Sequence, residues 1–238
     1  MEDVELHAKE INRCNQRSER MFTLIDLIRE KSLPLELAAF LLCRVSKGDS
    51  FLTGAVPGGA GKTTLMCALI NCIPNDMLIR HAESPAAMLL GENLPPSCFV
   101  CHEIGRGDYF AYLWGEEARQ FFRLKSYGHI LASNLHADNL EEARLQLVKQ
   151  NGVKENEFNS VNLYLFLAYG VQRKVSSVWC SKEGEPHREV YDGGKLNARG
   201  LAGEKDLKIY EEFLLEMDEE NVHTIEDFRK ELAGFRDG

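Results

Sequence analysis

The sequence contains no run of 18 apolar residues, which is about the length that a membrane-spanning helix needs. Its first ten residues, MEDVELHAKE, also lack the basic and then apolar pattern of a signal peptide. Basic residues number 28 against 37 acidic ones, and the net charge of −9 disfavours a protein that grips nucleic acid over a broad surface. We therefore expect a soluble, cytoplasmic protein that reaches a membrane only through a partner.

Cysteine pairs that would suit a disulfide framework or a zinc site are scarce. The seven cysteines are an odd number scattered through apolar segments, which is typical of reduced cytosolic thiols. Cys98 and Cys101 form one CxxC, but the sequence has neither a second such pair nor a suitably spaced histidine pair. We interpret them as two thiols in a buried strand.

The organisation of the 238 residues favours one substantial core with appended helices, and an apolar content of 44% is enough to pack it. Residues 1–45 show helical spacing and predict an N-terminal helical extension. Over residues 46–195 short apolar runs alternate with helical segments, which is typical of an α/β fold with a mainly parallel sheet. VQRKVSSVWC and HREVYD, separated by KEGE, predict a closing β-hairpin. Residues 196–238 predict an acidic helical C-terminal extension.

The segment SFLTGAVPGGAGKTTLMCALI has the order strand, glycine-rich loop, helix. Gly58, Gly59 and Gly61 can adopt backbone angles that turn successive N–H groups inward, toward a phosphate. The N-terminus of the following helix adds its positive end. Lys62 supplies a charge for the β- and γ-phosphates, and the hydroxyl of Thr63 can bind Mg²⁺. The predicted nucleotide-binding residues are Pro57, Gly58, Gly59, Ala60, Gly61, Lys62, Thr63 and Thr64.

One position departs from the strict phosphate-loop pattern GxxxxGK[ST]. Val56 stands where the first glycine is expected, and Gly54 lies two residues earlier. The alternative is a glycine-rich turn with an exposed lysine, but it does not explain why Lys62 and Thr63 follow together at the start of a helix. We expect Val56 to alter the curvature of the loop without preventing nucleotide binding.

Later apolar runs end in residues that could act on a bound nucleotide. SCFVCHE ends in Glu103, and a strand beside a phosphate loop commonly presents an acid that holds the magnesium shell or polarises the attacking water. MLIRHAESP places Glu83 similarly. For both carboxylates the alternative is a solvated surface charge. GHILASNLHAD ends near His136, which is either a γ-phosphate contact or a structural histidine.

Four segments, in order, resemble the secretion ATPase superfamily, the motor ATPases of type II and type IV secretion, type IV pili and archaeal flagella. VPGGAGKTT resembles the family's GPTGSGKTT, and IRHAESP resembles its acidic box TIEDP, which aligns Glu83. FVCHEIGRGD resembles the atypical Walker B motif LVGEIRD, which aligns Glu103. YGHILASNLHAD resembles the histidine box TGHLVFSTLHTN, which aligns His136. After these four segments, VQRKV is similar to the family's QRLVR, and the resemblance as a whole covers roughly residues 34 to 192.

Three residues depart from these motifs. His102 replaces the glycine before the Walker B glutamate, Gly105 is inserted after it, and Ser84 stands in place of an aspartate in the acidic box. The large folded N-terminal domain that family members usually carry is replaced here by about 45 helical residues, and the family's tetracysteine insertion is absent.

The resemblance implies a RecA-like P-loop NTPase core that binds and hydrolyses ATP with Mg²⁺. Lys62 and the loop amides would hold the triphosphate, while Thr63 would bind Mg²⁺ with Glu103 on the magnesium side, partly through water. Glu83 is the favoured catalytic carboxylate, and His136 would sense the γ-phosphate. The resemblance also implies a homo-oligomeric ring, typically a hexamer, that acts on membrane-associated machinery through a protein partner.

Three other functions fit parts of the sequence. A nucleotide-gated regulatory or scaffold protein with little or no turnover is favoured by the short N-terminal segment and the altered Walker B motif. A small-molecule kinase would need a lid with several arginines, and the arginines after position 100 are dispersed. A nucleic-acid translocase on the same core is disfavoured by the acidic charge.

Overall fold

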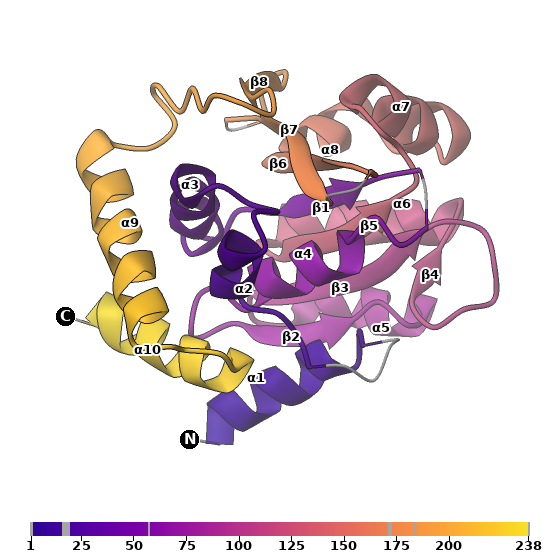
Figure 1. Cartoon of the computed structure of the whole chain (residues 1–238). Helices are drawn as coiled ribbons and strands as arrows, with labels where there is room; N and C mark the ends of the chain where they lie inside the picture. The colour runs from indigo at the N-terminus through magenta and orange to yellow at the C-terminus, as the bar shows by residue number, and fades with distance from the viewer. Residues whose placement is uncertain (1, 16–19, 57, 171–172, 183, 238) are drawn as a thin grey trace.

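The computed structural model describes residues 2–15, 20–56, 58–170, 173–182 and 184–237 (Figure 1). Within these residues eight strands form one sheet. The strands are β1 (Phe51–Gly54), β2 (Leu78–His81), β3 (Ser97–Ile104), β4 (Tyr112–Leu113), β5 (Ile130–Leu135), β6 (Leu163–Ala168), β7 (Lys174–Cys180) and β8 (Arg188–Tyr191). Their order across the sheet is β2-β3-β5-β1-β6-β7-β8, with β4 paired to β3.

The sheet is parallel from β2 through β6, because every pairing among β1, β2, β3, β4, β5 and β6 is parallel. β7 and β8 then add two antiparallel strands at the other edge. The mainly parallel sheet and the closing hairpin that the sequence predicts are therefore confirmed. In such a sheet the carboxyl ends of neighbouring parallel strands meet at one edge, which is where ligands bind in open α/β folds.

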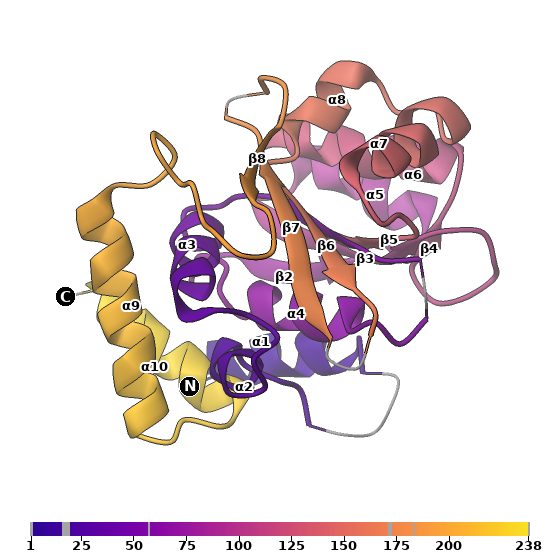
Figure 2. The same cartoon turned by 45° about the horizontal axis from the view of Figure 1, so that its top comes forward.

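Helices cover both faces of this sheet (Figure 2). The α-helices are α1 (Glu2–Asn12), α2 (Leu24–Arg29), α3 (Leu35–Val45), α4 (Lys62–Ile70), α5 (Pro85–Leu90), α6 (Glu116–Arg123), α7 (Leu140–Arg144), α8 (Glu155–Ser160), α9 (Glu204–Glu219) and α10 (Ile225–Asp237). Shorter helical turns are η1 (Gly91–Asn93), η2 (Leu124–Tyr127) and the π-helical η3 (Leu145–Gln150). Within the part of the chain that the structure describes, no helix is both long and apolar enough to span a bilayer.

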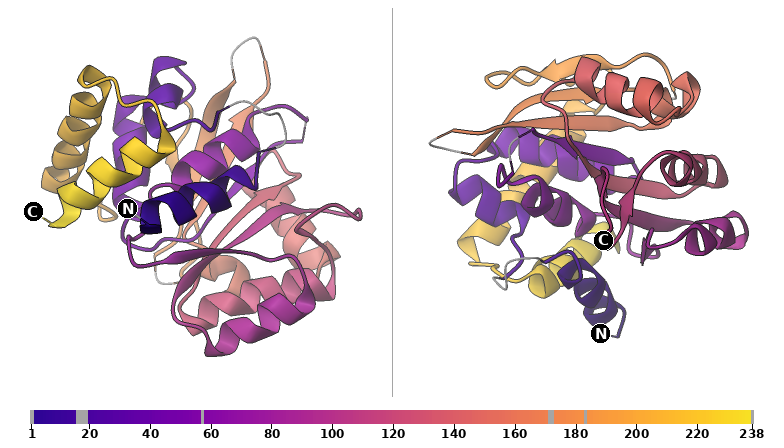
Figure 3. Two further views of the ribbon diagram at one scale, coloured as in Figure 1. Left: turned by 90° about the horizontal axis from the view of Figure 1, so that it is seen from below. Right: turned by 90° about the vertical axis from the view of Figure 1, so that its right-hand side faces the viewer.

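Alternation along the strands builds two hydrophobic cores, one on each face of the sheet. Phe51 packs into the core that α1, α2, α3, α4, α9 and α10 share, whereas the next residue, Leu52, packs into the core under α5, α6, α7 and α8. The same alternation separates Val100 from Cys101 on β3. The result is three layers, with the sheet between two helical layers (Figure 3).

Helices from the two ends of the chain pack together in the first of these layers. α1 contacts α10 and α3 contacts α9, so the predicted N- and C-terminal helical extensions share one core with the sheet (Figures 1 and 3). Buried Arg229 of α10 strengthens this packing, because its guanidinium donates to the carbonyl oxygens of Asn71, Ile73 and Pro74 just beyond α4.

Gly54 ends β1 where the backbone of another segment comes very close. A Cβ on this glycine would lie 2.5 Å from the carbonyl oxygen of Ala137 and 2.7 Å from the Phe166 ring. We expect Gly54→Ala to lower the free energy of unfolding by about 2 kcal/mol, since the backbone must shift to make room. Urea unfolding measures the loss. Gly58→Ala is the matched control, because a Cβ there meets nothing within 4 Å. Equal stability of the two variants would contradict the steric explanation.

His7 makes the packing of α1 on α10 sensitive to pH. Burial lowers the pKa of His7 to about 3, and the nearby charge of Arg229 acts in the same direction. The neutral form is therefore the folded form, so its contribution to stability is complete above pH 6.5 and is lost as the pH falls toward 3. We expect about 2 kcal/mol of this contribution to be lost between pH 7 and pH 5.

Denaturant unfolding at pH 7, 6 and 5 measures this loss, with His7→Leu as the comparison. The variant should lose less stability over this range than the parent. Part of the pH dependence of the unfolding free energy should remain, because burial also lowers the pKa values of His81 and His187. An identical pH dependence in parent and variant would contradict the role of His7.

Candidate functional site

The glycine-rich loop connects β1 to α4 at the carboxyl edge of the parallel strands. Gly59 and Gly61 have φ angles of 83° and 98°, a left-handed conformation that favours glycine. The N–H of Val56 donates to Asp138 Oδ1 at 2.7 Å, which anchors the start of the loop although Val56 replaces the expected glycine. The loop leads directly into the N-terminus of α4 at Lys62, as the sequence predicts. Pro57 lies outside the described residues.

A cavity of about 710 Å³ lies over this loop. It is lined by residues 58–65 of the loop and α4, by residues of the segment between α1 and α3, by the end of β3 and by residues 167, 173 and 175 of the β6–β7 region. This volume lies within the range of small-molecule sites, about 300–1,000 Å³. The cavity therefore offers the predicted phosphate loop a space of the size that a nucleotide needs.

Lys62 and Glu103 meet on the floor of the cavity. Lys62 Nζ lies 3.1 Å from Glu103 Oε1 and donates to the carbonyl oxygen of Ala55 at 2.8 Å. The side chains are only 12% and 14% exposed, so the ion pair is largely shielded from water. Glu103 comes from β3, which is separated from β1 by β5. A phosphate group bound here would compete with Glu103 for the Lys62 ammonium group.

An irregularity in β3 directs two consecutive residues toward this cavity. The pairing of β3 with β5 shifts register between Cys101 and Ile104, which is the interval that contains His102 and Glu103. Neighbouring residues of a regular strand point to opposite faces, but both of these residues line the same cavity. The two departures from the Walker B motif, His102 and the inserted Gly105, flank Glu103 at this irregular end of the strand.

Asn134, at the end of β5, joins the three strands at the site, and the sequence analysis assigned it no role. Its Oδ1 accepts from Thr53 Oγ1 at 2.6 Å, and its Nδ2 lies 3.2 Å from Thr63 Oγ1 and 2.7 Å from the carbonyl oxygen of His102. The amide is buried. The signal that could have identified it is a polar side chain at the carboxyl end of an otherwise apolar parallel strand.

The residues present fit a magnesium ion in the same cavity. The hydroxyl of Thr63 and the carboxylate of Glu103 are hard oxygen ligands, which Mg²⁺ prefers, and both residues line the cavity beside Lys62. The structure thus brings together the predicted residues Gly58, Gly59, Ala60, Gly61, Lys62, Thr63, Thr64 and Glu103.

Two predicted residues lie apart from this group. Glu83 follows β2, is 46% exposed in its side chain and forms an ion pair with Arg13 at 3.1 Å. His136 follows β5 and is exposed, and its backbone N–H donates to Gln146 Oε1 at 3.2 Å. Among the described residues that line the cavity, neither is present.

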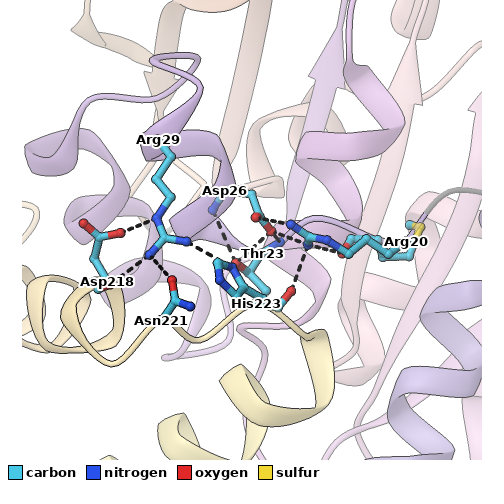
Figure 4. Close-up of polar contacts among 8 residues, drawn as sticks. Arg20, Thr23, Asp26, Arg29, Asp218, Asn221 and His223 are labelled. Carbon is cyan, nitrogen blue, oxygen red and sulfur yellow. Dashed lines mark hydrogen bonds and ion pairs between the residues drawn. The ribbon is translucent and has the colours of Figure 1, made fainter.

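Two arginines that were not among the predicted site residues also line the cavity, Arg20 before α2 and Arg173 of the VQRKV segment between β6 and β7. Arg20 forms an ion pair with Asp26, 2.5 Å from Oδ1, and donates to the carbonyl oxygen of His223 at 2.8 Å (Figure 4). Burial alone would raise the pKa of Asp26, but the Arg20 guanidinium and the hydrogen bonds from the backbone and side chain of Thr23 together lower it. Arg20 therefore links the cavity to the loop between α9 and α10.

Arg29 of α2 makes a second connection, to the last turn of α9 and to the loop that follows it. Its guanidinium donates to Asp218 Oδ1 at 2.5 Å and to the backbone oxygen of Asp218 at 2.8 Å (Figure 4). It also lies 3.0 Å from His223 Nδ1. The helical segment that forms one wall of the cavity is thus held by polar contacts to the C-terminal helices.

A thiol and an imidazole on the wall of the cavity lie near a second imidazole behind it. Cys14 and His102 line it, and the His81 ring lies 5.3 Å from the His102 ring. A hydrogen bond from Cys67 lowers the pKa of the Cys14 thiol, although burial acts in the opposite direction. Burial also lowers the pKa of His81.

Comparison with known proteins finds a likeness to solved structures but to no family model or curated protein. No protein-family model matches the chain, and no curated protein matches it. The chain is similar to the VirB11 ATPase of the Brucella suis type IV secretion system, solved in complex with sulphate, at 22% identity and a TM-score of 0.46. The match covers 66% of this chain and 54% of the VirB11 chain, so it spans about half the length of that protein. A likeness of this size establishes neither the fold nor the function of this chain.

Proposed function

We propose that this protein is a Mg²⁺-dependent ATPase with a RecA-like P-loop core. The observation that carries the proposal is the convergence of Lys62, Thr63 and Glu103 on one cavity, at the carboxyl ends of parallel strands and at the start of α4. Phosphoryl transfer asks little covalent chemistry of a protein, so positioning and charge neutralisation supply most of the catalysis. These residues provide both, as a cation for the phosphates and oxygen ligands for the metal.

Each residue has a definite part in this proposal. The loop amides and Lys62 hold the triphosphate, and Lys62 exchanges Glu103 for a phosphate oxygen as the nucleotide binds. Thr63 binds Mg²⁺, and Glu103 takes the magnesium side, partly through water. Asn134 positions the hydroxyl of Thr63, to which its amide lies 3.2 Å away.

Glu83 and His136 complete the proposed catalytic set as the water-polarising carboxylate and the γ-phosphate contact. For Glu83 this role requires the ion pair with Arg13 to open, because the carboxylate is otherwise neutralised by that guanidinium. The pair is exposed, and exposed ion pairs contribute only about 0–1 kcal/mol. Opening it is therefore not a large obstacle to catalysis.

We further propose that the chain works as a motor in a homo-oligomeric ring, as the sequence resemblance implies. In such an assembly hydrolysis releases contacts that hold one conformation, and the subunit and its neighbour shift together. Closed rings suit a repeated stroke. The proposed partner is membrane-associated secretion or pilus machinery, reached through a protein contact.

A nucleotide-gated regulator with little turnover is the second candidate. The observation in its favour is that Lys62 is engaged by both Glu103 and the Ala55 carbonyl oxygen, while Glu83 is engaged by Arg13. A protein that binds ATP by displacing these contacts can change shape without hydrolysis.

The test is ATP turnover per subunit, measured with Mg²⁺ over a range of protein concentrations, beside Glu83→Gln and Glu103→Gln. A rate per subunit that rises with concentration and falls in both variants supports an oligomeric motor with Glu83 as the catalytic carboxylate. Loss of turnover in Glu103→Gln but not in Glu83→Gln would show that Glu83 has no catalytic role and only forms its ion pair with Arg13. Tight ATP binding without turnover at any concentration would refute the ATPase and favour the regulator.

A further inference from the structure

Three buried side chains from distant parts of the sequence converge beside the cavity. Cys14 follows α1, His81 ends β2, and His102 lies near the end of β3. One potential ligand atom from each of these residues lies within 4.8 Å of the other two. The residues are 1%, 4% and 7% exposed, so all three side chains are buried.

Two ring nitrogens in this cluster have no hydrogen-bond partner within the described chain. His81 Nε2 lies 3.1 Å from the carbonyl oxygen of Glu10, which fixes Nε2 as the donor and leaves Nδ1 as a lone pair. That Nδ1 is buried and unpartnered, and so is His102 Nε2. Buried polar atoms almost always find a partner, so two orphan nitrogens in one cluster with a thiol point to a missing ligand.

The surroundings of the cluster resemble the outer shell of a metal site. The Glu10 carbonyl oxygen orients His81 as second-shell acceptors orient metal-binding histidines. Phe110 packs against both rings, at 5.0 Å from His102 and 5.5 Å from His81. The guanidinium of Arg13 lies over the Phe110 ring and forms ion pairs with Glu10 and Glu83.

We propose that Cys14, His81 and His102 bind one divalent transition-metal ion of the zinc class. A thiolate and two imidazoles are the ligand set that such ions select, whereas Mg²⁺ and Ca²⁺ prefer oxygen ligands. Zinc is usually four-coordinate, so three protein ligands leave one coordination position for water. Because Cys14 and His102 also line the cavity, water reaches that fourth position from there.

The site would fasten the N-terminal helix to the sheet beside the phosphate loop. α1 already contacts β2, and the metal would connect Cys14, just after α1, to His81 of β2 and His102 of β3. His102 precedes Glu103, and its carbonyl oxygen accepts from Asn134, so the metal would also fix the end of β3. The inference does not depend on the proposed ATPase, because metal binding is measured without nucleotide.

The experiment is a titration of the metal-free full chain, under reducing conditions, with Co²⁺ and then with Zn²⁺. We expect one equivalent of Co²⁺ to bind, with a thiolate-to-cobalt charge-transfer band that Zn²⁺ displaces. Cys14→Ala should abolish that band. His81→Gln and His102→Gln should each weaken binding by about 100-fold or more, since even outer-shell changes cost up to about 100-fold. Cys43→Ala is the matched control, because this buried cysteine of α3 lies outside the cluster and should leave the band unchanged.

Two results would overturn the proposal. One is a parent chain that takes up no Co²⁺ or Zn²⁺, which needs no variant and is therefore independent of any folding defect. The other is a charge-transfer band that persists in Cys14→Ala, which would place the metal on other thiols. Thermal unfolding gives a second measurement, in which Zn²⁺ should raise the Tm of the parent and of Cys43→Ala but not that of Cys14→Ala.

Discussion

In the proposed ATPase, replacing Lys62 with alanine is expected to lower ATP turnover by about 100-fold or more, because the variant would lose the cation that is proposed to face the developing phosphate charge. The same change should also destabilise the protein. Glu103, which is only 14% exposed in the parent, would lose its partner, and we expect a loss of about 2 kcal/mol in the free energy of unfolding. One substitution thus has a functional and a structural effect that need to be separated.

The double variant Lys62→Ala/Glu103→Gln separates them. Removing the charge of Glu103 should restore most of the lost stability, since no carboxylate is left unpaired, but it should not restore turnover. Steady-state phosphate release and urea unfolding measure the two effects on the same samples. Lys47→Ala is the matched control, because that lysine pairs with Asp206 at the surface and should affect neither quantity appreciably. Undiminished turnover in Lys62→Ala would contradict the phosphate-binding role of the loop.

Replacing Arg229 with alanine is expected to lower the free energy of unfolding by about 3 kcal/mol. The guanidinium donates to three carbonyl oxygens, those of Asn71, Ile73 and Pro74, at the end of α4, where a positive charge also complements the helix dipole. The residue is 4% exposed, so water cannot replace these bonds without entering the core.

Arg229→Lys should recover only part of the loss, because an ammonium group cannot span three carbonyl oxygens as the planar guanidinium does. Lys230→Ala is the control, since its exposed side chain is the next along α10. Denaturant unfolding measures all three variants. If Arg229→Ala and Lys230→Ala are equally stable, the C-terminal helix does not depend on Arg229 for its packing on α4.

Local patterns explain why the core of the fold could be predicted. The parallel sheet follows from short apolar runs with helices between them, and the glycine-rich loop between β1 and α4 follows from glycines and a lysine within a few residues. The closing hairpin could be predicted for the same reason, because its two strands and the turn between them are continuous in sequence. Each of these features depends on residues that are neighbours in the chain.

The remainder of the site depends on residues that only the fold brings together. Asn134 has a role because three strands end around it, and Arg20 lines the cavity although it lies 42 positions before Lys62. The cluster of Cys14, His81 and His102 follows no ligand spacing, so a search for paired cysteines or paired histidines could not find it. Glu83 illustrates the converse, because its motif suggests catalysis while Arg13, 70 positions earlier, holds it in an ion pair.

α4 is a rigid helix that other parts of the chain hold in place at both of its ends. Its nine residues, Lys62–Ile70, span about 13 Å at 1.5 Å per residue, and the carbonyl oxygens that Arg229 binds follow just beyond its C-terminal end. A hydrogen-bonded helix transmits a push along its axis with little compression. A displacement of α4 as a rigid body therefore either moves the C-terminal helix with it or breaks the hydrogen bonds of Arg229. Movements of the loop and of the C-terminal helix are thus coupled through α4.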